Sequence, residues 1–309
     1  MPAMREFLSR RGKFRPKGRE DETGAPQIPD DLWTKCPSCG DIIYTKELER
    51  SGQVCPKCDH HFRLRARERI ELLTDEDSFY EWDIALRGQD PLRFVDGGGS
   101  YAKKLEQTRE KSGEDEALIT GSATIAGHRC ALAVADFGFL GASMGSVFGE
   151  KLVRAIERAA DARVPIITMN ASGGARMHEG LLSLMQMAKT VAALARLGDA
   201  GVPHVAVLTD PCYGGVTASY ATVADIVMAE PGALIGFAGP RVIEQITKQK
   251  LPEGFQTAEF LLAHGMIDMI VPRAELRERL ADILALYQLA ETVSHGSIVG
   301  TREVGAGRD

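Results

Sequence analysis

Two stretches of the chain repeat one plan, Val164–Arg176 (VPIITMNASGGAR) and Val202–Val216 (VPHVAVLTDPCYGGV). In each, a run rich in β-branched residues leads to a glycine doublet, Gly173-Gly174 or Gly214-Gly215, and a stretch with a helical pattern follows. A strand, a glycine turn and a helix start leave backbone N–H groups unpaired where the helix dipole favours negative charge. This geometry can hold a phosphate, a carboxylate or a transient oxyanion. Having it twice favours chemistry over a single anion site.

Strand and helix patterns alternate around the two doublets. This alternation predicts an α/β fold, and the repeated strand–turn–helix unit is typical of a stacked ββα superhelix. The expected strands are 117–125 and 130–135, joined as a hairpin, then 164–169, 202–208, 224–229 and 233–236. The expected helices are 61–82, 150–162, 178–197, 216–223, 241–246, 257–263 and 274–289. Residues 86–116 read as irregular and polar, with a mobile insertion at 97–100.

The cysteines give the strongest local signal. Cys36 and Cys39 form one C-x-x-C pair, Cys55 and Cys58 form a second, and fifteen residues separate the two pairs. Two such pairs at this spacing predict one structural Zn²⁺ held by four thiolates, which leaves no open position for metal catalysis. Disulfides and thioredoxin-like redox pairs are the alternatives. Disulfides are disfavoured in a cytosolic protein, and a redox pair would not need a duplicate at this spacing.

Composition divides the chain into four parts. Residues 1–30 predict a flexible basic arm, and 31–60 a zinc ribbon that needs its metal to fold. Residues 61–293 predict the main α/β domain, and 294–309 a loose tail. Basic residues beside the second cysteine pair, together with the arm, leave two roles open, steering of an anionic substrate or contact with nucleic acid. The basic residues beside the pair are Lys57, His60, His61, Arg63, Arg65, Arg67 and Arg69.

Bulk properties exclude several classes of protein. The formal net charge of −6 argues against a protein that coats nucleic acid with its whole surface. No run of eighteen apolar residues predicts a membrane span, and the basic start lacks the apolar segment of a secretory signal, so we expect a cytosolic protein. A complete phosphate loop and the G-x-G-x-x-G pattern are both missing from the sequence, which sets nucleotide kinases and dinucleotide enzymes aside.

Taken together, these motifs resemble the β subunit of the bacterial acetyl-CoA carboxylase carboxyltransferase over roughly residues 31–290. The matching segments are the two Cys-Pro-x-Cys pairs, Asn170–Met177, Leu181–Ala193, Thr209–Pro211, Gly214–Ser219 and Ile235–Gln245. The resemblance implies a crotonase-type ββα superhelix behind the zinc ribbon. It also implies transfer of the carboxyl group from carboxybiotin to acetyl-CoA, which gives malonyl-CoA in the first step of fatty acid synthesis.

The same resemblance implies partners and a site. Biotin would arrive on a biotin carboxyl carrier protein, charged by an ATP-dependent biotin carboxylase, and a homologous α subunit would complete a hetero-oligomer of two α and two β chains. Two oxyanions form in the reaction, one on the biotin ureido oxygen and one on the thioester oxygen. We expect the backbone N–H groups of Gly173, Gly174, Gly214 and Gly215 to bind them, and we nominate no His or Glu as a base.

Some residues keep two interpretations. Arg176 can bind a carboxylate or a CoA phosphate, or pair with Glu179. Met177, Met185 and Met187 favour core packing over a binding face. Cys212-Tyr213 stands where the family usually has two threonines, so a carboxylase for propionyl-CoA or a longer acyl-CoA stays an alternative. A zinc-ribbon regulatory protein that binds nucleic acid is the other.

Overall fold

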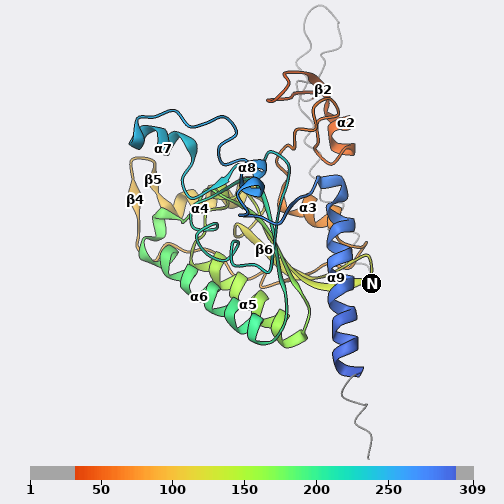
Figure 1. Ribbon diagram of the computed structural model, residues 1–309. Helices are drawn as coiled ribbons and strands as arrows, with labels where there is room; N and C mark the ends of the chain where they lie inside the picture. Colours follow the sequence, from red (N-terminus) through yellow and green to blue (C-terminus); the bar gives the residue numbers. More distant parts are fainter. Residues whose placement is uncertain (1–31, 297–309) are drawn as a thin grey trace, which may run out of the picture.

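The computed structural model describes residues 32–296, so the predicted arm 1–30 and nearly all of the predicted tail lie outside the described residues (Figure 1). A sheet of eight strands forms the centre. Its order is β12-β10-β9-β8-β7-β6-β3, with β11 also paired to β9, and the strands from β7 to β12 are parallel. The strands are β3 (Tyr80–Trp82), β6 (Leu118–Ile125), β7 (His128–Ala135), β8 (Ile166–Ser172), β9 (His204–Tyr213), β10 (Ile226–Ala229), β11 (Ile235–Gly236) and β12 (Met269–Ile270).

Helices cover both faces of the sheet. Helices α5 (Ser146–Ala162) and α6 (Leu181–Asp199) pack together on one face, and α3 (Ala66–Leu73) and α9 (Arg273–Gly296) lie on the other (Figure 1). Each interface has its own apolar cluster, because β7 to β9 carry apolar side chains toward both sides. This is the burial expected of parallel strands in an α/β protein.

The predicted hairpin is confirmed, and so is the prediction that the two glycine turns lie at the same edge of successive strand–turn–helix units. Strands β6 and β7 are antiparallel, and β8 and β9 are adjacent and parallel. Since Ser172 pairs with Cys212, both strands end at the same edge of the sheet and deliver their glycines side by side. The helices expected at 150–162, 178–197, 241–246, 257–263 and 274–289 are present as α5, α6, α7 (Pro240–Thr247), α8 (Ala258–Ala263) and α9.

The helix predicted over 61–82 is wrong in extent. Only Ala66–Leu73 is helical, begun by Arg65, whose backbone N–H donates to the Glu68 carboxylate at 2.9 Å, and β3 follows it. The alternating arginines of this segment have a period of two, which is not a helical period. Beyond the helix, Asp75 accepts the N–H groups of Ala126 and Gly127, and this holds the chain against the β6–β7 turn.

Residues 86–116 are not irregular throughout. Strands β4 (Val95–Asp96) and β5 (Gly99–Ser100) form a small hairpin where a mobile insertion was expected, and Gly99 takes the positive φ of +106° that its turn needs. Helix α4 (Tyr101–Ser112) follows directly. Its polar composition hides it in the sequence, because only Tyr101 and Leu105 are buried.

The helix predicted over 216–223 is also wrong. Residues 214–223 form successive turns, in which the hydroxyls of Thr217, Ser219 and Thr222 donate to nearby backbone carbonyls. Hydroxyl side chains that bond the backbone locally compete with regular helix hydrogen bonding.

The ribbon stands apart from the sheet at one end of the molecule (Figure 1). It consists of β1 (Trp33–Lys35), antiparallel to β2 (Ile42–Tyr44), and the short α2 (Thr45–Arg50). Helix α9 extends to Gly296, into the region predicted as tail. None of the helices within residues 32–296 has the length and apolar character needed to cross a lipid bilayer.

Candidate functional site

The two glycine turns touch each other at the end of β8 and β9. A Cβ atom placed on Gly214 would lie 2.9 Å from Gly174 Cα, a distance that real Cβ atoms do not reach. Gly174 and Gly214 also take positive φ values of +108° and +73°. Both positions therefore require glycine, for conformation and for close approach.

Three of the four N–H groups expected to bind an oxyanion already have acceptors within the loops. Gly173 donates to the Gly141 carbonyl at 2.8 Å, Gly174 to the Ser172 hydroxyl at 2.9 Å, and Gly214 to the Gly236 carbonyl at 3.0 Å. An external anion would have to share or displace these bonds.

The remaining donors are Gly215 and its neighbour across the two turns. Among the described residues, the N–H groups of Gly215 and Ala175 have no acceptor. A Cβ atom on Gly215 would lie 3.8 Å from the Ala175 nitrogen, so the two backbones run close together. Unpaired N–H groups on glycine turns are what a developing oxyanion needs. Ala175 was not named from the sequence, although it directly follows the first doublet.

Arg176 is a buried structural residue. Its guanidinium is fully enclosed and donates to Glu116 (Nη1–Oε2 3.0 Å), to Glu179 (3.4 Å) and to the Ser143 carbonyl. The pair with Glu179 was one of the two interpretations of the sequence, whereas Glu116 lies sixty residues away and gave no sequence signal. Because buried carboxylates neutralise its charge, Arg176 serves to hold the first glycine turn in place rather than to bind an external anion.

No free histidine stands ready as a base at the turns among the described residues. His204 is buried in the sheet, where burial lowers its pKa to about 3, and its Nε2 lies 2.9 Å from the Thr168 hydroxyl. The ring of His178 stacks on Tyr101 and has Lys104 Nζ 3.2 Å from its Nε2. Burial and the Lys104 charge lower the pKa of His178.

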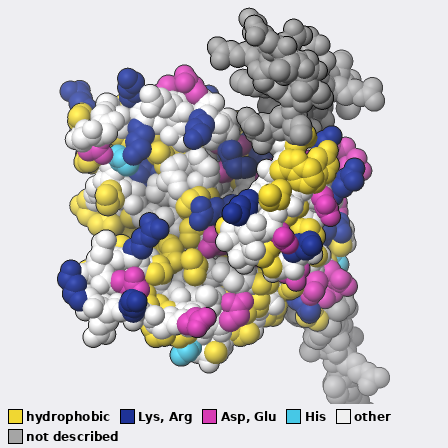
Figure 2. Space-filling model, turned by 90° about the horizontal axis from the view of Figure 1, so that it is seen from above, with side chains coloured by type: hydrophobic (Ala, Val, Ile, Leu, Met, Phe, Trp, Pro, Cys, Tyr) yellow, Lys and Arg dark blue, Asp and Glu magenta, His cyan; other side chains and the backbone are white. Residues whose placement is uncertain are grey.

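Exposed apolar side chains adjoin both turns. The expectation that the methionines fill the core is wrong for Met177 and Met185, which are 83% and 58% exposed, and holds only for Met187. Gly236, whose carbonyl accepts the Gly214 N–H, is soon followed by helix α7, and no residue of α7 is buried. Figure 2 views this end of the molecule from above and shows hydrophobic side chains interspersed with Lys and Arg around the middle of that face. The exposed apolar residues here are Met177, Leu181, Leu182, Leu184, Met185, Phe237, Val242 and Ile246.

The four predicted zinc ligands come together. The sulfur atoms of Cys36, Cys39, Cys55 and Cys58 all lie within 4.8 Å of one another, with Cys36–Cys58 at 3.7 Å and Cys39–Cys55 at 3.9 Å. A tetrahedron with Zn–S bonds of about 2.3 Å has edges of about 3.8 Å, so the cage fits zinc. All six cysteines are free of disulfides.

Three charged side chains join the ribbon to the sheet. Glu230 is buried between Arg69 (Oε1–Nη1 2.7 Å) and Arg273 (Oε2–Nη2 2.8 Å). Burial alone would raise the pKa of Glu230, but the two guanidinium groups outweigh burial and hold it at about 2. Arg273 also donates to the carbonyls of Gly52, Gln53 and Phe62 and thereby holds the ribbon on the domain.

The basic cluster predicted beside the ribbon is largely neutralised. Arg65 pairs with Asp136, Arg67 with Glu81 and Glu114, and Arg69 with Glu230. Their carboxylates come from distant parts of the chain, so the sequence gave no sign of this pairing.

Comparisons with known proteins agree with this architecture. Residues 60–267 match the carboxyl transferase domain family, and residues 33–58 match the acetyl-CoA carboxylase zinc finger domain. The chain is 59% identical over 291 residues to the acetyl-coenzyme A carboxylase carboxyl transferase subunit beta of Chloroflexus aurantiacus, covering 94% of each chain. It is 56% identical to the protein of the same name from Herpetosiphon aurantiacus over 262 residues, covering 85% of this chain and 88% of the relative.

Solved structures of carboxyl-group enzymes share the fold. A transcarboxylase 12S structure superposes with a TM-score of 0.60 at 27% identity, over 77% of this chain and 42% of that one. A Pseudomonas malonate decarboxylase hetero-dimer gives a TM-score of 0.55 at 26% identity, over 73% of this chain and 86% of that one. The expected crotonase-like α/β fold with a four-cysteine ribbon is confirmed, whereas none of the matched descriptions supports ATP binding. The chain belongs to the carboxyl transferase family and carries the zinc ribbon of acetyl-CoA carboxylases.

Proposed function

We propose that this chain is the β subunit of an acetyl-CoA carboxylase carboxyltransferase, which moves the carboxyl group of carboxybiotin to acetyl-CoA and forms malonyl-CoA. The observation that carries the proposal is the pair of unpaired N–H groups, Gly215 and Ala175, on two touching glycine turns. High identity to named β subunits over nearly the whole chain supports it.

The turns act as oxyanion donors in this proposal. Negative charge develops on the thioester oxygen as the acetyl methyl group loses its proton, and on the biotin ureido oxygen as CO₂ leaves. Fixed backbone N–H groups stabilise such charge without reorganisation, and one such donor is typically worth about 3 kcal/mol. We assign this chain's donor role to Gly215 and Ala175, while Gly173, Gly174 and Gly214 shape the turns and share their N–H groups at most in part.

The proton of the acetyl methyl group goes to the biotin nitrogen freed of CO₂, which is the chemistry that carrier-bound biotin supplies. A protein base is therefore not required. This agrees with the absence of a free histidine at the turns within residues 32–296 and with the neutralisation of Glu116 and Glu179 by Arg176.

The exposed apolar residues beside the turns support a second subunit. Helix α7 together with the first half of α6 leaves apolar surface uncovered. Exposed patches of this kind mark interaction sites. We propose a homologous α subunit as the partner, in an assembly of two α and two β chains, with the biotin carboxyl carrier protein and biotin carboxylase as the other components.

The proposal also covers the zinc site, the domain boundaries and the cellular compartment. One structural Zn²⁺ would be held by Cys36, Cys39, Cys55 and Cys58, and it would supply folding energy without entering the reaction. We assign 31–60 to the ribbon and 61–293 to the carboxyltransferase domain. Free thiols at all six cysteines are consistent with a reducing compartment such as the cytosol.

Reconstitution tests the proposal. The zinc-loaded chain is mixed with its cognate α subunit, a carboxylated biotin carrier and acetyl-CoA, and malonyl-CoA is measured. We expect product only when both subunits are present, and a lower kcat/KM with propionyl-CoA offered in competition. Absence of malonyl-CoA from a zinc-replete, assembled complex would contradict the proposal, and preference for propionyl-CoA would move it to another acyl-CoA.

A further inference from the structure

A hollow lies between the zinc ribbon and the carboxyltransferase domain, and the mechanism above does not use it. We call it the ribbon hollow. Its volume is about 620 Å³, within the range of small-molecule sites. It is lined by Thr34, Pro37, Thr45, Leu48, Gln53, His60, His61, Phe62, Arg63 and Asp210.

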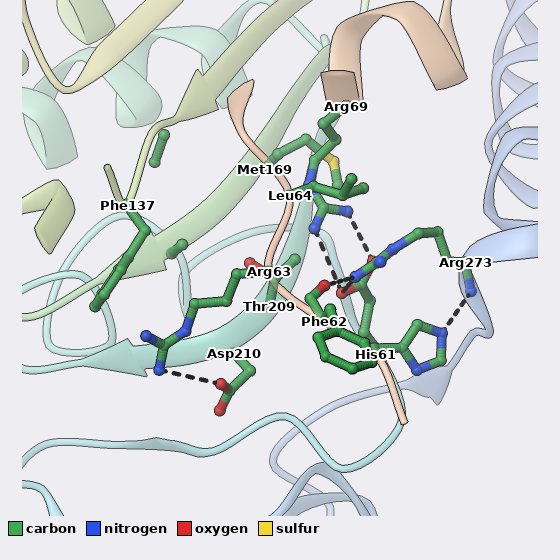
Figure 3. A pocket seen from close by; sticks show the side chains of 13 residues that line it. His61, Phe62, Arg63, Leu64, Arg69, Phe137, Met169, Thr209, Asp210 and Arg273 are labelled. Carbon is green, nitrogen blue, oxygen red and sulfur yellow. Dashed lines mark hydrogen bonds and ion pairs between the residues drawn. The ribbon is translucent and has the colours of Figure 1, made fainter. Parts of the chain in front are cut away.

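Arg63 is the cation of the ribbon hollow, and it differs from its three neighbours in sequence. Arg65, Arg67 and Arg69 each have a carboxylate partner within 2.9 Å. The only ion-pair or hydrogen-bond partner of the Arg63 side chain among the described residues is Asp210, at 3.4 Å, and the Arg63 side chain is 52% exposed. Its guanidinium lies over the Phe137 ring, 4.5 Å from the centroid (Figure 3). Of five N–H donors in a planar fork, most stay available to an anion, and phosphate oxygens fit that fork.

His61, another lining residue, carries an unpaired donor. Its Nε2 accepts the backbone N–H of Arg273 at 3.2 Å, so the neutral ring carries its proton on Nδ1. This Nδ1 is buried and has no partner among the described residues. A buried donor without an acceptor is destabilising and calls for an explanation. Arg63 and His61 together favour a ligand rich in acceptors.

The apolar part of the lining suits a flat base. Pro37 and Leu48 come from the ribbon, and Phe62 from the segment that joins it to the domain. A ligand held here would therefore contact the ribbon and the domain at once, which ties its binding to the ribbon's position.

Strand β9 runs from the wall of the ribbon hollow toward the second glycine turn. Asp210 lines the hollow, and Gly215 follows five residues later on the same strand and turn. Five residues of extended chain span at most about 18 Å. The pantetheine arm of CoA separates its thioester from its adenosine phosphates by a distance of the same order. A thioester at Gly215 thus allows the other end of the molecule to reach Arg63.

We propose that the ribbon hollow binds the 3′-phosphoadenosine end of acyl-CoA, with Arg63 as the phosphate-binding residue. The inference rests on the proposed function for the identity of the substrate. Asp210 competes with the ligand for the guanidinium, and its carboxylate is the one acidic group in the lining.

Binding to the zinc-loaded full chain, without any α subunit, tests this directly. Calorimetry compares acetyl-CoA with 3′-dephospho-acetyl-CoA, and adenosine 3′,5′-bisphosphate with AMP. We expect each 3′-phosphorylated ligand to bind at least tenfold more tightly than its partner. Equal affinities within each pair would overturn the proposal.

Three variants locate the effect. Arg63→Met should reduce the preference for the 3′-phosphate to less than twofold, and Asp210→Asn should tighten binding of adenosine 3′,5′-bisphosphate two- to fivefold. Arg279→Met is the matched control, because Arg279 is 49% exposed and has one distant carboxylate, Asp282 at 3.9 Å. It should leave every affinity within twofold. An equal loss in Arg63→Met and Arg279→Met would contradict the assignment, provided that zinc content and thermal transition match the wild type.

A nucleic acid is the competing source of phosphate, and a separate experiment tests it. Short single-stranded RNA is titrated over a series of salt concentrations with wild type and Arg63→Met. If the variant lowers the salt dependence of RNA binding while leaving the preference for 3′-phosphorylated CoA intact, the hollow is a nucleic-acid site and the proposal fails. Because the binding assays need no turnover, phosphate-dependent binding in a complex that makes no malonyl-CoA would sink the proposed function and leave this inference standing.

Discussion

The zinc ribbon and the eight-stranded sheet are stabilised in opposite ways. The ribbon's apolar cluster contains only four buried residues, Cys36, Ile43, Leu48 and Cys55, and two of them are metal ligands. The sheet carries a large apolar cluster on each face. The ribbon is thus held by thiolates and by the buried charges of Arg273 and Glu230, whereas the sheet is held mainly by apolar packing on both of its faces. The difference implies that the two regions can unfold or lose stability separately, each in response to a different change.

Removal of zinc should have the largest effect and should act on the ribbon alone. A chelator, or Cys55→Ser, should unfold residues 33–58, since structural zinc contributes about 10–16 kcal/mol of apparent binding free energy in small zinc domains. Hydrogen exchange measures this at the amides of the two cysteine turns and, for comparison, in β8. Protection that persists in the ribbon after complete loss of metal would show that apolar packing suffices there.

Loss of the charge at the junction should come next. Glu230→Gln leaves Arg69 and Arg273 buried without a counter-charge, and breaking a buried pair in this way typically costs about 3–5 kcal/mol. Denaturant unfolding of the zinc-loaded chain measures the change. Asp282→Asn, which affects an exposed pair, serves as the control and should change stability by less than about 0.5 kcal/mol. Similar small effects of both substitutions would mean that the ribbon is held by other contacts.

The smallest of the three effects tests the burial of a neutral histidine, His204, in the sheet. Burial lowers the pKa of His204 to about 3 from its ordinary 6.5, so below pH 6.5 the unfolded chain binds a proton that the folded chain refuses. The stabilising contribution of the neutral ring is complete above pH 6.5 and decreases as the pH falls, by about 1.4 kcal/mol at pH 5.5.

His204→Gln should remove this part of the pH dependence. The free energy of unfolding is measured for both proteins at pH 7.5 and pH 5.5, with zinc kept in excess so that the ribbon contributes equally. The wild type should lose about 1.4 kcal/mol more than the variant. Parallel losses would place the titrating group elsewhere.

Much of this molecule could be read from its sequence, and the misses have physical causes. The cysteine spacing gave the zinc cage, and the two β-branched runs gave β8 and β9 with their adjacent glycine turns. Local sequence patterns gave the wrong element where polar side chains donate to the backbone, as at Thr217. They also missed a helix with only two buried residues, α4.

The donors themselves depended on contacts that a sequence does not show. Which N–H groups stay free is decided by acceptors such as the Gly141 and Gly236 carbonyls, which lie on other loops. The pairing of Arg176 with Glu116 and of Arg273 with Glu230 likewise joins distant segments. Charged side chains that look free to bind a ligand in the sequence are thus paired with each other in the folded protein.

The central claim is that the Gly215 N–H stabilises an oxyanion, and a pair of substitutions at that residue tests it most directly. Gly215→Ala keeps the N–H. Its methyl group would lie 2.5 Å from Met144 Cε and 2.8 Å from Met187 Sδ, so these flexible side chains must shift, and 3.8 Å from the Ala175 nitrogen, which is an ordinary contact. Gly215→Pro removes the N–H. In the reconstituted assay, with zinc content and subunit assembly matched, kcat should fall by roughly 10²–10³ in the proline variant relative to the alanine variant. Equal kcat values in the two assembled variants would contradict the account.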